Sequence, residues 1–417
     1  MNDSNMVPQA PLDRDAELDR LDGIVRDALR QARRLGADEA EVHVSASQGL
    51  SVNVRLGEVE TLEYMQDRGV SVTVYDGRRK GVASSADLKP ESIAECVRRA
   101  TDIARYTQED PCNGLADPGL LAREQPDLDL WHPVTMDATA AIERALACEE
   151  AGRSDSRISN SEGATLFTQR SSFVYGNSHG FIGGYPTSRH SLSCAVIAQQ
   201  GDEMQRDYWY DSDRVPTEIA DPASIGRRAA ERALARLNGR RLGTRECPVL
   251  FSANIAPSVL RSLFGAIRGH AVYRKSTFLL DQVGEQIFPD WVNISEDPLK
   301  PRGKASAPFD NEGVATHYRD LVKDGVLQGY LLDSYAARKL GLRSTASAGG
   351  VHNARIAPSG ESFDELLRDR IGTERVRSLR EVAPDVYDDR RPGPAAEPLS
   401  LGLVLAGGER HPRRVPP

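Results

Sequence analysis

Two short polar segments in the last third of this 417-residue chain carry side chains that are suited to holding a ligand. The first consists of Tyr273, Arg274, Lys275 and Ser276, which place a phenol, two cations and a hydroxyl side by side. Such a group can hold a peptide carboxylate or a peptide backbone through charge-assisted hydrogen bonds. An ordinary interface or a solvated loop has the same composition. The segment is therefore a candidate contact for a substrate or a partner.

The second segment consists of Gly349, Gly350, His352 and Asn353. Paired glycines let the backbone approach another chain closely or adopt positive φ, and the imidazole and amide beside them supply directional hydrogen bonds. A tight turn whose polar side chains satisfy nearby backbone groups is the structural alternative. We treat these four residues as the second candidate contact for a substrate or a partner.

Residues 257–269, PSVLRSLFGAIRG, predict a helix without metal ligands. Its apolar face is formed by Val259, Leu260, Leu263, Phe264 and Ile267. A helical zinc site needs two imidazoles about one turn apart and a carboxylate for general-base work. Here the available positions hold Arg261, Ser262 and Ala266. The eight histidines elsewhere are dispersed, and the five cysteines form no C-x-x-C pair. We predict no metal site and no catalytic residue in this chain.

Two carboxylates, Asp310 and Glu312, lie two residues apart in the segment PFDNEGV, a spacing that is compatible with an acid–base pair. Acidic residues in loops more often form turns, and we favour that interpretation. His270 has no partner at ligand spacing, so we interpret it as a surface or packing residue.

The net charge of -8 gives the chain no general attraction for nucleic acid or for an anionic membrane surface. The first twenty residues are acidic and lack the apolar centre of a secretory signal. No run approaches the roughly 18 apolar residues that a membrane helix requires. We therefore expect a soluble cytoplasmic protein with neither a nucleic-acid nor a membrane partner.

The first part of the chain predicts a helix, antiparallel strands and a second helix. Apolar residues repeat with a helical period over 13–35 and stop at Gly36. The period then changes to two, with Asp76-Gly77 as a hairpin signal. The second helix is expected at about 90–107. Residues 13–110 are interpreted as an N-terminal domain.

Residues 111–134 are rich in Pro, Gly and Asp and are expected to form a linker on the surface. A middle α+β region follows at 135–240, with several short alternating stretches between two helices. A β-rich C-terminal domain is expected at 246–363. Because helices and strands are segregated, the predicted fold class is α+β. The divergent tail, 364–417, has six prolines in its last 26 residues and is expected to be poorly ordered.

Four segments resemble the PmbA (TldE) branch of the TldD/PmbA family: GHAVYRKSTFLLDQVGEQIFPDW, ISEDP, KASAPFDNEGV and RKLGLRSTASAGGVHN. The resemblance extends from about residue 20 to Phe363. It implies that the TldD branch carries a His-Glu-x-x-x-His zinc helix where this chain has residues 257–269, and that the PmbA branch lacks it.

The resemblance also implies a heterodimeric zinc peptidase that acts on unfolded peptides. In such a complex a TldD-type subunit supplies the zinc, and a PmbA-type subunit completes the chamber. This chain would then be the subunit without metal. Two alternatives stay open: a peptide-binding protein without a proteolytic partner, and an autonomous metal-dependent hydrolase that uses scattered ligands such as His270, His317 and His352.

Overall fold

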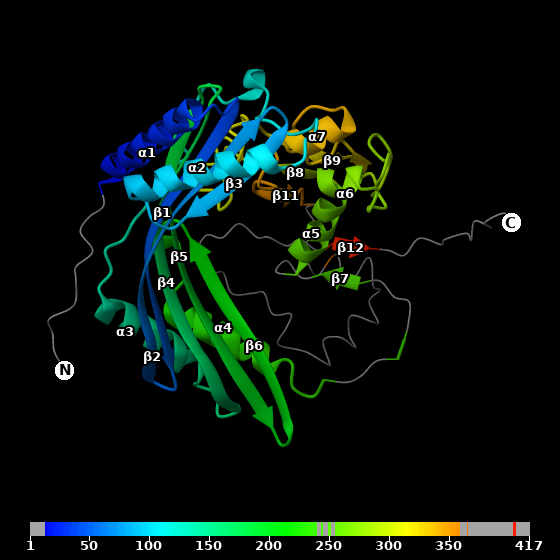
Figure 1. Ribbon diagram of the computed structural model, residues 1–417. Coiled ribbons are helices and arrows are strands. Elements are labelled where there is room, and N and C mark those ends of the chain that lie inside the picture. Colours follow the sequence, from blue (N-terminus) through cyan, green and yellow to red (C-terminus); the bar gives the residue numbers. More distant parts are fainter. Residues whose placement is uncertain are drawn as a thin grey trace.

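The computed structural model describes residues 13–239, 243–244, 249–251, 255–358, 365 and 403–405. The chain has the predicted α+β fold, with helices lying on antiparallel sheets (Figure 1). Among the described residues, no helix is long and apolar enough to cross a membrane.

The largest element is a six-stranded antiparallel sheet with the order β3-β2-β1-β4-β5-β6. Its strands are β1 (Glu39–Arg55), β2 (Glu58–Asp76), β3 (Arg79–Ser85), β4 (Ile158–Asn177), β5 (Ile182–Gln200) and β6 (Glu203–Asp213). The central pair, β1 and β4, joins a strand from the first part of the chain to one from the middle region. Residues from the two predicted units 13–110 and 135–240 therefore share one sheet.

The middle region contains long strands, so the prediction of several short stretches between Ile158 and Asp213 was wrong. Pro186 lies within β5 although proline cannot donate to a strand ladder. It is tolerated because β6 pairs with β5 only from His190 onward, so Pro186 has a strand partner on one side alone, Ser172 of β4. The hairpin predicted at Asp76-Gly77 is confirmed, since it joins β2 to β3.

Two pairs of helices cover one face of this sheet (Figure 1). Helices α1 (Arg14–Arg34) and α2 (Pro90–Tyr106) pack on Val42 and Val44 of β1. Helices α3 (Ala138–Gly152) and α4 (Pro222–Leu234) pack on Val52 and Val54 of the same strand. Side chains alternate along a strand, so these four valines lie on one face. The sheet thus has two apolar cores, one toward each end of its long strands.

Residues 111–134 lie on the surface only in part, since Asp117–Gly119 and Arg123–Asp127 are exposed and the apolar residues between them are not. Their apolar residues Leu115, Ala116, Ala122, Leu128 and Leu130 are buried. A short 3-10 helix, η1 (Pro118–Leu120), is followed by a bridge between Leu121 and Val314. The segment is therefore a packed strap between the large sheet and the C-terminal part of the chain. Its composition signalled turns, but the apolar residues between the turns determine its burial.

The described residues of the C-terminal part form a four-stranded sheet with the order β10-β9-β8-β11 and three helices. The strands are β8 (Ile294–Glu296), β9 (Arg319–Lys323), β10 (Val326–Leu327) and β11 (Ala354–Ile356), and the helices are α5 (Ala256–Ala266), α6 (Gly269–Tyr273) and α7 (Ser334–Leu340). Leu263 and Ile267 are buried in its core, as the apolar period predicted. In the middle region, a further short 3-10 helix, η2 (Pro216–Glu218), precedes α4.

A separate two-stranded sheet pairs β7 (Val249–Phe251) with β12 (Leu403–Leu405). Apart from residue 365 and β12, the predicted tail at 364–417 lies outside the described residues, and so does the expectation about its order.

Candidate functional site

A polar cleft of about 350 Å³ lies where one end of the large sheet meets the strap and the C-terminal part. We call it the acidic cleft. It is lined by Glu41, Tyr75, Lys80, Cys112, Asn113, Gly114, His270, Glu312, Asp333 and Tyr335. The sheet supplies the first three of these residues, the strap the next three, and the C-terminal part the rest. The cleft thus forms only when distant parts of the chain pack together.

The sheet contributes a buried carboxylate, Glu41 of β1. The hydroxyl of Tyr175 donates to Glu41 Oε2 at 3.0 Å, and Asn177 Nδ2 donates to the same hydroxyl oxygen at 3.3 Å. Burial, together with the charge of Glu41, raises the pKa of Tyr175 above its usual value. Burial also raises the pKa of Tyr75. Both phenols therefore stay neutral and act here as hydrogen-bonding groups.

Two further carboxylates come from the loop after β8. Asp310 accepts hydrogen bonds from the backbone N–H groups of Glu312, Val314 and Ala348 at 2.9–3.0 Å, so it holds the turn, as we favoured from the sequence. Glu312 lines the cleft and accepts a hydrogen bond from the Ser334 N–H at 2.9 Å. Burial raises the pKa of Asp310 to about 6 and that of Glu312 to about 7. Glu312 can therefore take up or release a proton near neutrality.

A fourth carboxylate, Asp333, caps the N-terminus of α7 by accepting a hydrogen bond from the Ala336 N–H at 2.6 Å. Its other oxygen, Oδ2, lies 3.7 Å from Nδ1 of His270. The His270 ring is stacked with that of Tyr335, with 6.4 Å between their centroids. His270 thus lies in the cleft with a carboxylate and a phenol beside it, and nothing in the spacing along the chain predicts either neighbour.

Helix α7 fixes the strap that forms one wall of the cleft. Arg338 Nη1 donates to the backbone carbonyls of Cys112 and Gly114 at 3.0 Å each. The Tyr335 hydroxyl and the Lys339 ammonium donate to the two oxygens of Asp110 at 2.7 and 3.0 Å. Hydrogen bonds from the Cys112 N–H, Tyr335 and Lys339 lower the pKa of Asp110 to about 2. The wall is therefore held by charge-assisted contacts from one helix.

The first predicted segment, Tyr273 to Ser276, lies beside this cleft. The Tyr273 ring contacts the rings of His270 and Tyr335, with centroids 5.4 and 6.0 Å apart. Arg274 and Lys275 are exposed, and the Arg274 guanidinium lies over the Tyr273 ring at 5.7 Å. The exposed Ser276 closes the turn after α6 by hydrogen bonding to the Ala271 carbonyl. The two cations are thus available to a ligand at the edge of the cleft.

The second predicted segment makes contacts within the C-terminal part. Asn353 accepts from the Ala305 N–H and donates to the Asp297 carbonyl, at 2.8 Å in both cases. The His352 N–H donates to Glu296, and burial lowers the pKa of the His352 imidazole. Gly349 and Gly350 both have positive φ, of 103° and 124°. These contacts fit the structural alternative, a turn that satisfies nearby backbone groups.

A zinc ion does not fit the residues that the structure describes. Within the described ranges, no group of three or more His, Cys, Asp or Glu side chains is arranged to hold a metal ion. His270 lies beside Asp333, whereas His352 lies beside Glu296 and His317 is exposed. The three histidines considered for an autonomous hydrolase are therefore not gathered into such a group.

Sequence reasoning missed Glu41, Tyr75, Asp333 and Tyr335 as members of a site and set Glu312 aside. Each is unremarkable within its own segment, because a strand, a hairpin and a short helix supply them separately. The capping position of Asp333 was the one local signal, since an Asp before a helix is a common N-cap. It pointed to the helix and not to the cleft.

Comparison with known proteins shows that three successive regions of the chain match one class of peptidase. Three family models match the chain: domain 1 of the PmbA/TldA metallopeptidases at residues 40–104, the central domain at 131–237 and the C-terminal domain at 244–372. The matched domains define a chain of metallopeptidase type. It belongs to the PmbA/TldD family.

Individual relatives agree with this assignment. The metalloprotease PmbA of Escherichia coli O157:H7 is 49% identical over 350 residues, which cover 83% of this chain and 78% of that protein. A metalloprotease TldD homolog of Haemophilus influenzae is 22% identical over 74% of this chain and 66% of its own length. The fold matches the crystal structure of TldE from Thermococcus kodakarensis with a TM-score of 0.70 at 20% identity, over 83% of this chain and 80% of that one.

Proposed function

We propose that this chain is the metal-free subunit of a cytoplasmic zinc peptidase of the TldD/PmbA family. In this proposal a TldD-type partner holds the zinc, and this chain completes the chamber and holds unfolded peptide. The chain itself contributes no catalytic residue.

The observation that carries the proposal is the composition of α5. By the resemblance, this helix occupies the place of the zinc helix in the TldD branch. Its exposed residues include Arg261, Ser262 and Gly265, and its buried residues include Leu263 and Ala266. None of these side chains replaces the imidazoles or the carboxylate that a helical zinc site requires. Helix α5 therefore packs in the core of the C-terminal part but lacks side chains that could bind zinc.

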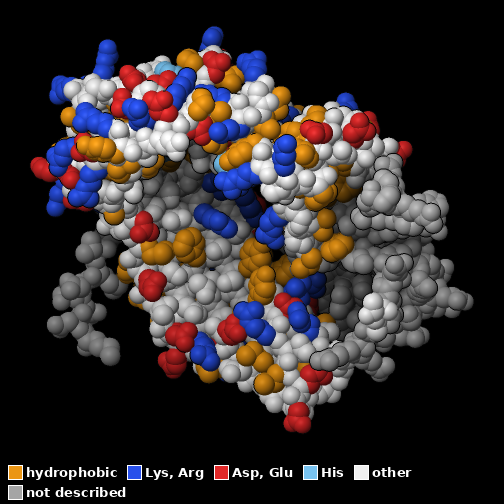
Figure 2. Space-filling model, turned by 45° about the vertical axis from the view of Figure 1, so that its right-hand side comes forward, with side chains coloured by type: hydrophobic (Ala, Val, Ile, Leu, Met, Phe, Trp, Pro, Cys, Tyr) orange, Lys and Arg blue, Asp and Glu red, His pale blue; other side chains and the backbone are white. Residues whose placement is uncertain are grey.

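The acidic cleft and its edge supply groups that suit peptide binding. Glu41, Glu312 and Asp333 can accept hydrogen bonds from an ammonium or from backbone N–H groups. Arg274 and Lys275, exposed at the edge, can donate to a carboxylate or to backbone carbonyls. Figure 2 shows one face of the molecule hollowed between its upper and lower parts, with Lys and Arg side chains gathered in the hollow. The polar lining of the acidic cleft favours contact with polar peptide backbone over binding of an apolar ligand.

The similarity of this chain to a TldD homolog supports a TldD-type partner, because it extends over 74% of this chain and indicates two proteins with related folds. Two chains with related folds can pair about a pseudo-twofold axis through equivalent surfaces, as homodimers do through identical ones. A stable pair should bury at least about 1,200 Å² in total.

Co-purification from the native cell tests this proposal. The chain should be recovered with a TldD-type protein, and zinc analysis should find the metal in that protein and less than one equivalent in this chain alone. Recovery without such a protein would favour a peptide-binding protein that acts alone. One tightly bound zinc in the isolated chain would favour the autonomous hydrolase.

A further inference from the structure

Tyr75 of β2 is a buried residue that lines the acidic cleft. Its side chain is only 4% exposed. Among the residues that the structure describes, none forms a hydrogen bond with the Tyr75 hydroxyl. The Tyr175 hydroxyl, by contrast, donates to Glu41 at 3.0 Å. Buried tyrosine hydroxyls normally have a hydrogen-bond partner, so we expect Tyr75 to find one in a molecule that enters the cleft.

Two carboxylates of the cleft, Glu41 and Glu312, accept hydrogen bonds from neutral groups. Glu41 accepts from the Tyr175 hydroxyl, and Glu312 accepts from the Ser334 N–H. No Lys, Arg or His side chain within the described ranges forms an ion pair with either carboxylate. Besides burial, the charges of both carboxylates raise the pKa of Tyr75, because both lie close to its hydroxyl. Since buried charges are normally paired, this arrangement calls for a cation.

The other charged groups that line the cleft do not supply this cation. Lys80 is exposed, and its ammonium lies over the Tyr75 ring, 5.8 Å from the centroid. His270 lies 3.7 Å from Asp333, which is itself a carboxylate. Burial raises the pKa of Glu312 to about 7, as is typical of a carboxyl without a cation beside it. The lining thus has more acidic than basic side chains over a volume of about 350 Å³.

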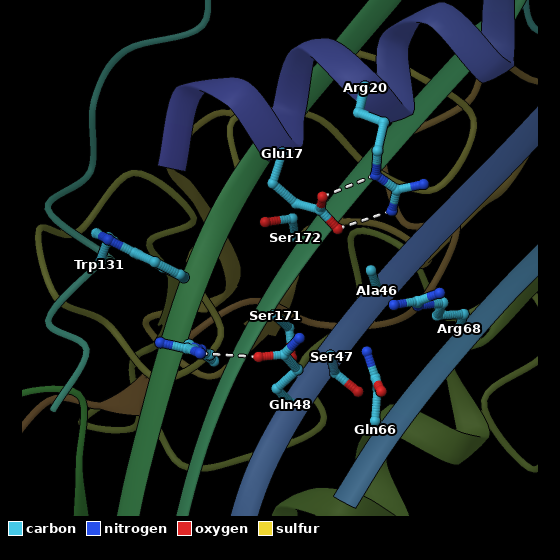
Figure 3. A pocket seen from close by; sticks show the side chains of 11 residues that line it. Glu17, Arg20, Ala46, Ser47, Gln48, Gln66, Arg68, Trp131, Ser171 and Ser172 are labelled. Carbon is cyan, nitrogen blue, oxygen red and sulfur yellow. Dashed lines mark hydrogen bonds and ion pairs between the residues drawn. The ribbon is translucent and has the colours of Figure 1, made fainter. Parts of the chain in front are cut away.

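A second polar pocket, of about 290 Å³, shows a different arrangement of charge. It lies between α1 and the large sheet (Figure 3). Its carboxylate, Glu17, is paired with Arg20 of the same helix through two hydrogen bonds of 2.8 Å. The acid of that pocket therefore has its cation within the chain, whereas the described residues supply none to Glu41 and Glu312.

We propose that the acidic cleft binds an ammonium group of a peptide, which is either its N-terminus or a lysine side chain. An ammonium carries three N–H donors, and Glu41, Glu312 and the Tyr75 hydroxyl offer acceptors for them. A metal ion fits less well, because the described residues contain no group of three or more His, Cys, Asp or Glu side chains arranged to hold one. The proposal rests on the peptide-binding role proposed above and narrows it to one chemical group of the peptide.

Calorimetric titration of the full chain with small amines tests this proposal. Ala-Ala amide represents a free N-terminus, N-acetyl-lysine amide represents a lysine side chain, and N-acetyl-Ala-Ala amide is the neutral control. At least one of the two amines should bind at least tenfold more tightly than the neutral amide, because only the amines bring a positive charge to the carboxylates. The tighter amine identifies the source of the ammonium.

Tyr75→Phe should weaken the tighter amine about tenfold, because a hydrogen bond to a charged group is lost. Its thermal unfolding midpoint should not fall, since the hydroxyl has no partner among the described residues of the free protein. The matched control is Tyr64→Phe, which removes a hydroxyl from an exposed position of the same strand and should leave amine binding unchanged. Glu41→Gln keeps an acceptor for the Tyr175 hydroxyl and should also weaken the amine at least tenfold.

Three results would overturn the proposal: equal binding of the amines and the neutral amide, equal binding of the amine by the Tyr75→Phe and Tyr64→Phe variants, or binding of calcium ions as tight as that of the tighter amine. Failure of both amines to bind would also overturn it, and would leave the peptidase-subunit proposal to its own test by co-purification. Amine binding by a chain that is recovered without a TldD-type protein would support this proposal and count against the subunit proposal alone.

Discussion

Burial raises the pKa of the Glu312 carboxyl, which lines the acidic cleft. Its carboxyl has a pKa of about 7, so the folded state holds a proton that the unfolded chain releases at lower pH. Proton uptake in the folded state stabilises the fold below the ordinary pKa of a glutamate. That stabilisation is lost as the pH rises through about 7.

Glu312→Gln should therefore change how stability depends on pH. The glutamine keeps an acceptor for the Ser334 N–H and removes the titrating group. Between pH 5 and pH 8 the free energy of unfolding of the unchanged protein should fall by up to about 3 kcal/mol more than that of the variant. Chemical denaturation at the two pH values measures the difference. The control is Glu124→Gln, at an exposed position in the strap. A variant that follows the unchanged protein at both pH values would contradict the raised pKa of Glu312.

The residues of the site were only partly predictable. Asp310 was predicted to form a turn because acidic residues in loops commonly do so. Its carboxylate accepts hydrogen bonds from N–H groups within the same loop and at Ala348, as that interpretation requires. The importance of Glu312 depends on its burial in a cleft that Glu41 and Tyr75 also line, and those two residues come from strands far away in the chain. No local pattern carries that information.

Among the elements, helix α5 was predictable because its apolar period is complete within the helix itself. Its register buries Leu263 and Ile267 and exposes Arg261 and Ser262, as the period requires. The lengths of β4 and β5 were not predictable, because glycines and Pro186 within them resemble strand ends. Whether such residues end a strand depends on which neighbours pair beside them, and that is a property of the sheet.

Leu263→Ala should destabilise the protein by about 2–5 kcal/mol, because it removes buried methyl groups from the core of the C-terminal part and leaves a cavity. Arg261→Ala, on the exposed side of the same helix, should change stability by no more than about 0.5 kcal/mol. Urea denaturation of both variants measures the two values. Equal effects would contradict the assignment of the buried face of α5.

At the scale of the whole molecule, the six-stranded sheet joins the first and middle parts of the chain and positions the four helices that pack on it. The pairing of β1 with β4 brings together strands that are separated by the strap and two helices. Sequence periodicity predicted strands in both parts, but it carries no information about which strands pair across such a separation. The family resemblance led to the proposed function, whereas the acidic cleft emerged only from the assembled fold.

Replacing Arg274 and Lys275 together by Ala should weaken peptide turnover by the complex, or its assembly, at least tenfold. Both side chains are exposed beside the acidic cleft, so the change removes charge and leaves the core intact. The matched control is the double replacement of Arg98 and Arg99 by Ala, which removes the same charge from the exposed side of α2. Turnover and co-elution with the partner are measured for both variants, and thermal unfolding verifies the fold. Equal turnover by the two variants would contradict a role for the 273–276 segment.

Reconstitution with the TldD-type protein from the same cell tests the central claim most directly. Each protein is purified alone, and cleavage of an unfolded peptide is measured for each and for the mixture, with and without a zinc chelator. We predict that neither protein alone cleaves efficiently, and that mixing restores a chelator-sensitive activity that rises to a plateau at equal amounts of the two chains. Cleavage by the TldD-type protein that is equally fast with and without this chain would contradict the claim.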